Sequence, residues 1–346
     1  MYLVLLGAIS LFAITFLNDK YKNGRKYFCV ATAILLILYA SLRSKDLYPD
    51  TPGYYSVYLN ISQYGFNKVL TLFDGGTKNP TFYFLGWIFS KAFPDAQMWL
   101  AFLSILYIVA IIYLISKESK NPYVSVIIFL SLGYFTFSLT GLRQALAMTL
   151  MVPAYFMAKR HKPIKFILIV LLAYLFHNTA LIFLLIYPIR NLKFGWFHVF
   201  FISACLVVSL FFKSQFKEFI GEVFKDSYLG GYSDNDKSLN FSGIIIQLAI
   251  FVFSLFYYKN ITAKNKDVLI LYNCAFLGLS FQLFSIVVAE MFRVSMYFSI
   301  FNLILIPLAI VSEPKTRWQN IESILITVVL LAYILIGRVP EYSFFW

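Results

Sequence analysis

The sequence predicts an all-α integral membrane protein that crosses the bilayer many times. Three observations predict this class: 60% of the 346 residues are hydrophobic, only 13% are charged, and the mean hydropathy is +0.76. Soluble domains carry about 25% charged residues, and a water-soluble fold could not hide so much apolar surface. We expect a single multi-span membrane domain over residues 1–346.

Clear candidate spans follow one another along most of the chain, since a span needs about 20 apolar residues. They lie at residues 1–17, 27–42, 96–116, 122–140, 196–213, 241–259, 267–288, 291–311 and 319–337. No basic region precedes the first, so we expect a span there rather than a cleaved signal peptide. Segment 143–190 is harder to assign, because polar residues interrupt its apolar pattern.

Basic clusters in the short loops predict the orientation, because cytoplasmic loops carry an excess of Lys and Arg. The clusters lie at residues 20–26, 159–165, 190–193, 259–266 and 315–317. All can be cytoplasmic only if segment 163–189 crosses out and back, turning at His177–Asn178. One full span there would export the last three clusters. We therefore predict about twelve transmembrane helices plus short re-entrant or interfacial helices.

This topology gathers the polar features on the outer side. Two hydrophilic loops, about 43–80 and 214–240, face outward together with His177 and the turns at 140–143 and 290–293. The apolar stretch 81–93 is too short to span and is predicted to be a half-helix or an interfacial helix. We expect the protein to work at its outer surface.

Arg143 and Gln144 stand between two long apolar stretches. An ionisable group at membrane depth costs roughly 2.5–3.5 kcal/mol, so its default interpretation is functional. With Thr140 as N-cap, Arg143 would begin a helix, where free N–H groups and the helix dipole favour an anion such as phosphate. The alternative is an arginine that reaches toward outer headgroups.

His177, Glu290 and Arg293 are further candidates on the same side. His177 could donate to a phosphate or exchange a proton near neutral pH, or bond carbonyls freed by a break in the helix. Glu290 and Arg293 are three residues apart, so they could pair internally. Otherwise Arg293 is a second cation for an anionic substrate, positioned by Glu290.

The two outer loops are rich in acids and tyrosines, which suits carbohydrate. Asp50 could act as a general base for a hydroxyl acceptor, and Tyr54 could stack on a sugar. Pro-Asp-Thr-Pro-Gly at 49–53 is equally a turn sequence. Tyr232, in the second loop, lies in a segment that could bind sugar or form a solvated lid.

Other classes of function find little support. The chain has no Walker, HExxH, GxSxG or Rossmann motif, and its three cysteines lie inside apolar runs without metal-ligand spacing. We therefore predict no metal and no cofactor. The net charge of +13 is explained by cytoplasmic loops and suits anionic lipids, so nucleic acid is not an expected partner.

Three motifs together resemble the EpsG-like group of Wzy-type polysaccharide polymerases. They are Arg43 with Asp50-Thr51 and Tyr54, then Gly141-Leu142-Arg143-Gln144-Ala145-Leu146-Ala147, then Phe176-His177-Asn178-Thr179-Ala180-Leu181. The likeness covers most of the chain in order and spacing. The first loop departs from the commoner Gly-x-Asp-Thr form, which leaves the role of Asp50 less defined.

The resemblance implies a fold like that of membrane (GT-C-like) glycosyltransferases and a specific reaction. Such enzymes join undecaprenyl-pyrophosphate-linked oligosaccharide repeat units into O-antigen or related surface polysaccharide, at the outer face of the bacterial inner membrane. Arg143, with Arg43 or Arg293, would neutralise the departing pyrophosphate. A flippase for the same lipid-linked sugars and an O-antigen ligase remain alternatives, and the sequence leaves open whether a chain-length regulator binds.

Overall fold

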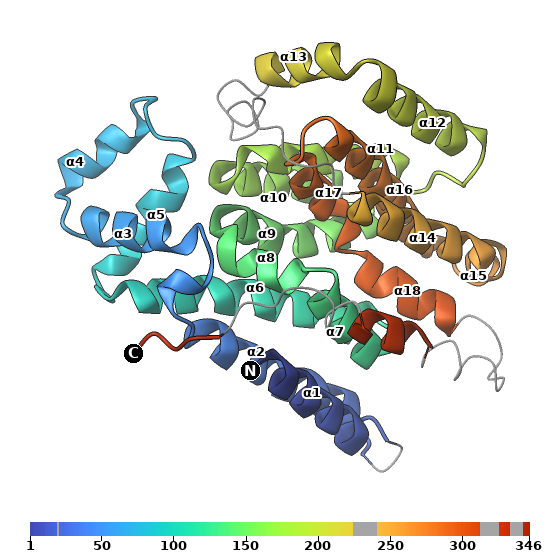
Figure 1. Ribbon diagram of the computed structural model, residues 1–346, viewed down its shortest axis with the longest axis horizontal. Coiled ribbons are helices and arrows are strands. Elements are labelled where there is room, and N and C mark those ends of the chain that lie inside the picture. The colour runs from blue at the N-terminus through green and yellow to red at the C-terminus, as the bar shows by residue number, and fades with distance from the viewer. Residues whose placement is uncertain (19–20, 224–240, 312–324, 333–341) are drawn as a thin grey trace. The chain divides into compact units, whose positions relative to one another are not determined.

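The computed structural model describes residues 1–18, 21–223, 241–311, 325–332 and 342–346, and these form helices with one isolated β-bridge. Figure 1 labels these helices along the chain. The chain divides into two compact units. Unit 1 comprises residues 1–152, 172–177 and 315–346, and unit 2 comprises residues 153–171 and 178–314.

Three helices of unit 1 pack side by side. They are α1 (Tyr2–Phe16), α2 (Gly24–Ser41) and α6 (Ala96–Glu118). Arg25 donates to the carbonyls of Ile115, Ser116 and Ser119 at the C-terminal end of α6, at 2.5–3.0 Å. Gln97, at the other end of α6, donates to the carbonyls of Ser41 and Arg43. Helices α2 and α6 are therefore antiparallel. We call the end of this pair that holds residues 41–43 the loop end, and the opposite end the Arg25 end.

Short helices lie between α2 and α6, at the loop end. They are η1 (Lys45–Leu47), α3 (Thr51–Ser62), α4 (Phe66–Leu70), η2 (Thr71–Phe73) and α5 (Pro80–Ser90). Helix α5 has 11 residues, so the prediction that stretch 81–93 holds a short, non-spanning helix is confirmed. The C-terminal residues return to this end, where Arg43 and Phe344 form an antiparallel bridge.

The next two helices bend at a glycine. Helices α7 (Pro122–Ser131) and α8 (Tyr134–Thr140) meet at 51°, and Gly133 between them has φ +77°, which a residue without Cβ adopts at little cost. Helix α9 (Leu142–Lys159) follows directly and contains Pro153, where the chain passes from unit 1 into unit 2.

Segment 163–189 folds back on itself, as the loop charges predicted. Helix α10 (Pro163–Phe176) ends before His177, and η3 (Asn178–Leu185) and α11 (Ile186–Ile189) follow. The rings of Phe166 and Tyr187 lie 5.1 Å apart, whereas one continuous helix would separate them by about 30 Å. His161 and Arg190 hydrogen bond at 2.9 Å, so the two basic clusters lie at one end of this hairpin.

The rest of unit 2 surrounds a buried aromatic core. Its helices are α12 (Trp196–Phe211), α13 (Lys213–Val223), α14 (Ser242–Phe256), α15 (Tyr258–Lys264), η5 (Lys266–Val268), α16 (Leu269–Leu283), η6 (Phe284–Ile286), α17 (Met291–Ser299) and α18 (Asn302–Ile310). Phe183 stacks on Phe298 and Phe301, and Phe301 stacks on Tyr155. The η3 segment is thus packed on α17 and on the residue that precedes α18, and that residue packs in turn on the unit 2 part of α9.

The protein is a helical membrane protein. Among the described residues, three helices are long and apolar enough to cross a bilayer, and up to six spans result if each bent pair counts as one. These residues do not support the predicted count of about twelve spans, which stays a prediction together with the likeness to GT-C-like glycosyltransferases. In the predicted span 319–337 only residues 325–332 are described, as helix.

The fold-back can be tested by cross-linking. A Phe166→Cys/Tyr187→Cys double variant, made with the native cysteines replaced, should form a disulfide when a small oxidant is added, because the two side chains face each other across the hairpin. Leu168→Cys/Tyr187→Cys is the matched control, because Leu168 is 60% exposed on another face of α10. Equal cross-linking yields for the two pairs on denaturing gels would contradict the hairpin.

Candidate functional site

The carbonyl of Leu139 joins the first loop to the start of α9. It accepts a hydrogen bond from Thr51 Oγ1 at 3.0 Å and one from Arg43 Nη2 at 3.3 Å. Thr51 and Arg43 are both fully buried, and Leu139 lies in the last turn of α8. Arg43 and Thr51, both in the first motif, therefore meet at one backbone oxygen two residues before the second motif begins.

Arg43 is occupied with protein groups. Its Nη1 donates to the Ala40 carbonyl and to Ser104 Oγ, and its Nε is buried without a hydrogen-bond partner. Burial lowers the pKa of Arg43 to about 10, so the guanidinium stays charged at neutral pH. Through these hydrogen bonds, the Arg43 guanidinium fixes the end of α2 against α6 and α8. The predicted contact of Arg43 with substrate stays a prediction.

Arg143 is the second residue of α9 and is half-buried in a different environment. Its Nε donates to the Tyr54 hydroxyl and its Nη1 donates to the Lys78 carbonyl, both at 3.3 Å. Its guanidinium carbon lies 5.8 Å from the Tyr54 ring centre and 5.9 Å from that of Tyr83. Such flanking rings orient the guanidinium plane. The structure thus brings Arg143 and Tyr54 together, as the shared outer side predicted.

Tyr54 offers a protonated hydroxyl at this position. Burial raises the pKa of Tyr54, and the charge of Arg143 opposes that rise. Because the Tyr54 oxygen accepts from Arg143, its own proton can be donated to a ligand. Asp50 is half-buried at the start of α3, close enough for its charge to raise the pKa of Tyr54 as well.

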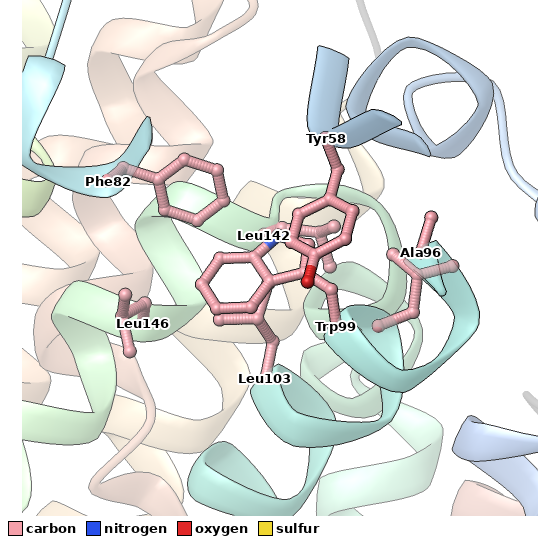
Figure 2. Close-up of a cluster of buried hydrophobic side chains, with 8 residues drawn as sticks. Tyr58, Phe82, Ala96, Trp99, Leu103, Leu142 and Leu146 are labelled. Carbon is pink, nitrogen blue, oxygen red and sulfur yellow. The ribbon is translucent and has the colours of Figure 1, made fainter. Parts of the chain in front are cut away.

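A cluster of buried aromatic and aliphatic side chains packs against the start of α9 (Figure 2). Tyr58 stacks on Trp99 at 5.6 Å, and Phe82 lies 5.6 Å from Trp99. Leu142 and Leu146, one helical turn apart on α9, complete the cluster with residues of α6. Arg143 follows Leu142 directly, so packing on α3, α5 and α6 fixes the position of its backbone.

Gly141 allows the sharp entry into α9. A Cβ there would come within 2.6 Å of the Phe137 ring, so a side chain would displace that ring or the helix start. Thr140 is the last residue of α8, and α9 begins at Leu142 after Gly141. The prediction that Thr140 caps this helix was wrong, because α8 extends up to the turn.

His177 directly follows α10, next to the same cluster. Its amide donates to the Ala173 carbonyl at 3.0 Å, its side chain is 8% exposed, and Phe176 packs against the aromatic cluster. The third motif thus begins at the core that supports Arg143. Gln144 is buried as well, with 3% of its surface exposed. The functional roles predicted for His177 and Gln144 are not tested by these contacts.

Glu290 and Arg293 belong to unit 2. Glu290 is buried and precedes α17, and the amide of Arg293 donates to its carbonyl at 2.9 Å. The apolar residues around this turn pack against Ile182 of η3, and Thr179 Oγ1 donates to the Tyr297 hydroxyl. Within unit 2, the second half of the His177 motif therefore adjoins the Glu290 turn. Convergence of Arg293 with Arg143 stays a prediction.

Other predicted features have limited structural description. Tyr232 and most of the 214–240 loop lie outside the described residues, as do Lys315 and Arg317. Within the described ranges, no group of three or more His, Cys, Asp or Glu residues could hold a metal ion. Sequence reasoning missed Tyr83, Gln97 and the carbonyls of Lys78 and Leu139. Their roles come from tertiary contacts, which no local sequence pattern marks.

The geometry defines a helical membrane protein with an arginine presented at a helix start. The EpsG family model matches residues 26–344, and the chain belongs to the EpsG family. The match includes all three motifs. No curated protein and no solved structure matches the chain significantly.

Replacing Thr51 tests its hydrogen bond to the Leu139 carbonyl, which we call the tie. Thr51→Val keeps the side-chain shape but removes one buried hydrogen bond, so the free energy of unfolding should fall by about 1 kcal/mol. The control is Thr149→Val, because Thr149 only bonds the Ala145 carbonyl within α9. Denaturant unfolding in detergent measures both. Equal effects of the two substitutions would contradict a special role for the tie.

Proposed function

We propose that the protein is a polymerase that joins undecaprenyl-pyrophosphate-linked oligosaccharide repeat units at the outer face of the bacterial inner membrane. Family membership supports a polysaccharide polymerase. The observation that carries the proposal is Arg143, held by Tyr54, Tyr83 and the Lys78 carbonyl at the start of α9. An oriented cation beside a helix N-terminus suits a pyrophosphate.

The proposed reaction is a glycosyl transfer from a lipid carrier. A hydroxyl of the acceptor unit attacks the anomeric carbon of the growing glycan, and the bond from that carbon to the pyrophosphate oxygen breaks. The leaving undecaprenyl pyrophosphate gains negative charge, which Arg143 stabilises as that charge develops. The acceptor proton passes to a base. No nucleotide is consumed, because cleavage of the bond between the anomeric carbon and the pyrophosphate supplies the energy.

Other residues take supporting roles in this proposal. Tyr54 orients Arg143 and donates its hydroxyl proton to a phosphate or sugar oxygen. Asp50 accepts the acceptor proton, and His177 donates to the pyrophosphate or assists proton movement. Arg43 positions the first loop through Leu139 rather than touching the substrate, because it is fully buried. In this proposal Arg293 is a second cation for the anionic substrate, and Glu290 positions Arg293.

Loss of the Arg143 charge should abolish polymerisation. In proteoliposomes supplied with lipid-linked repeat units, Arg143→Ala should reduce chain extension by about 10²–10³-fold, as removal of a preorganised charge-stabilising donor does. Single units should still be exported in cells. Arg160→Ala is the control, since Arg160 is an exposed arginine in the predicted cytoplasmic cluster.

The product pattern separates the alternatives in the same assay. A ladder of products means polymerase, one addition to lipid A core means ligase, and movement across the membrane without new bonds means flippase. Normal chain length with Arg143→Ala would refute the role of Arg143. A wild-type protein that moves lipid-linked units without joining them would refute the polymerase itself.

Replacement by lysine should have different effects at Arg43 and at Arg143. Arg43→Lys breaks a buried multidentate contact, so thermal stability and turnover should fall together. Arg143→Lys keeps the charge at a half-exposed position, so turnover should fall while the unfolding midpoint stays unchanged. Thermal unfolding followed by intrinsic fluorescence, beside the polymerisation assay, measures both. Unchanged stability in Arg43→Lys would contradict the positioning role.

A further inference from the structure

A cavity of about 580 Å³ lies at the Arg25 end of unit 1, away from Arg143. It is open to the surface and is lined by α1, the beginning of α2, the loop that joins α6 to α7 and the first residues of α7. Helix α6 has 23 residues and is therefore about 34 Å long, which is enough to cross the hydrocarbon core. The cavity and the loop end accordingly lie at opposite ends of a membrane-length helix. None of the proposed catalytic residues lines it.

One half of the cavity is basic and rich in hydrogen-bond donors. Arg25 is held in place by three carbonyls of the α6 end, and the ammonium group of Lys120 is exposed at the rim. On the wall, the Ser10 hydroxyl donates to the Leu6 carbonyl at 2.9 Å and pairs with the Tyr123 hydroxyl at 3.0 Å, beside Asn121. Glu118, the last residue of α6, does not line the cavity. The Lys120 ammonium group, the Asn121 amide and the guanidinium of Arg25 suit the oxygens of a phosphodiester.

The other half is apolar and continues onto the surface of α1. Ala13, Ile14 and Leu17 line the wall, and Ile14 is 74% exposed. Leu11, on the preceding turn of α1, is 61% exposed as well. An alkyl chain leaving the cavity would therefore run along an apolar helix face. A free phosphate or an acidic peptide would leave this surface uncovered.

Aromatic residues place the cavity at the depth of lipid headgroups. Phe16 contacts the rings of Tyr21 and Tyr27 at 6.1 Å, and both tyrosines are exposed. Exposed tyrosines beside an apolar helix end are typical of the membrane–water interface. The exposed side chains of Lys22, Lys26 and Lys117 add positive charge at the same end.

We propose that this cavity binds the headgroup of an anionic phospholipid from the leaflet at the Arg25 end. The phosphate lies between Lys120 and Asn121, with Arg25 behind it, and an acyl chain lies along α1. The lipid would stabilise the packing of α1 on α2 and α6. The proposal is independent of the polymerase reaction, because it concerns the opposite end of unit 1.

Native mass spectrometry of the full-length protein in an uncharged detergent tests the proposal. Phosphatidylglycerol and phosphatidylcholine with identical acyl chains are added at equal concentration. The wild type should retain phosphatidylglycerol preferentially. Lys120→Ala should weaken that retention about fivefold, the effect expected of one lysine near an anionic lipid. Lys165→Ala, a neutralised exposed lysine of unit 2, is the matched control and should leave retention unchanged.

A second variant keeps the test valid without changing charge. Ala13→Phe fills the apolar wall and should abolish selective retention. Each variant is used only with an unfolding midpoint equal to the wild type. Equal retention of the two lipids by the wild type would overturn the proposal. So would unchanged retention in Ala13→Phe, or displacement of the lipid by a polyglutamate peptide.

Discussion

The arrangement of the candidate site depends on one backbone oxygen. The Leu139 carbonyl accepts from Arg43 and from Thr51, which lie on either side of η1 in the first loop. Those two bonds hold the loop, and hence Tyr54, against the turn that begins α9. Arg143 can then donate to the Tyr54 hydroxyl. Without this tie, a half-buried arginine would have no fixed orientation toward an anion, and preorganisation is what gives such a charge its catalytic value.

The basic clusters in the loops predicted the path of segment 163–189 better than its apolar pattern did. Segment 163–189 reads as one long apolar run, yet the basic clusters on both sides required a reversal at His177. The contact of Phe166 with Tyr187 and the bond between His161 and Arg190 show that reversal. The span count did not follow in the same way. Bends at Gly133 and after Ser299 divide apolar stretches into helices shorter than a span, and sequence hydropathy alone does not reveal such bends.

The sequence grouped Arg43 and Arg143 as similar cations, and the structure separates them. Both stand next to apolar stretches, and both lie within residues 26–344, which the EpsG family model matches. Arg43 is fully buried and its donors contact the protein, whereas Arg143 is half-exposed between two tyrosine rings. The difference arises from α6 and α8, which supply Ser104 and Leu139 to Arg43. Local sequence cannot reveal partners that lie more than sixty residues away.

The central claim is that Arg143 binds the pyrophosphate of the lipid carrier. Calorimetric binding of farnesyl pyrophosphate to the purified protein in detergent tests it without any need for turnover. The account predicts that Arg143→Ala weakens this binding by roughly 10–100-fold, as loss of a charge-assisted contact does, while Arg160→Ala leaves it unchanged. Equal affinity of the wild type and Arg143→Ala for farnesyl pyrophosphate would contradict the account.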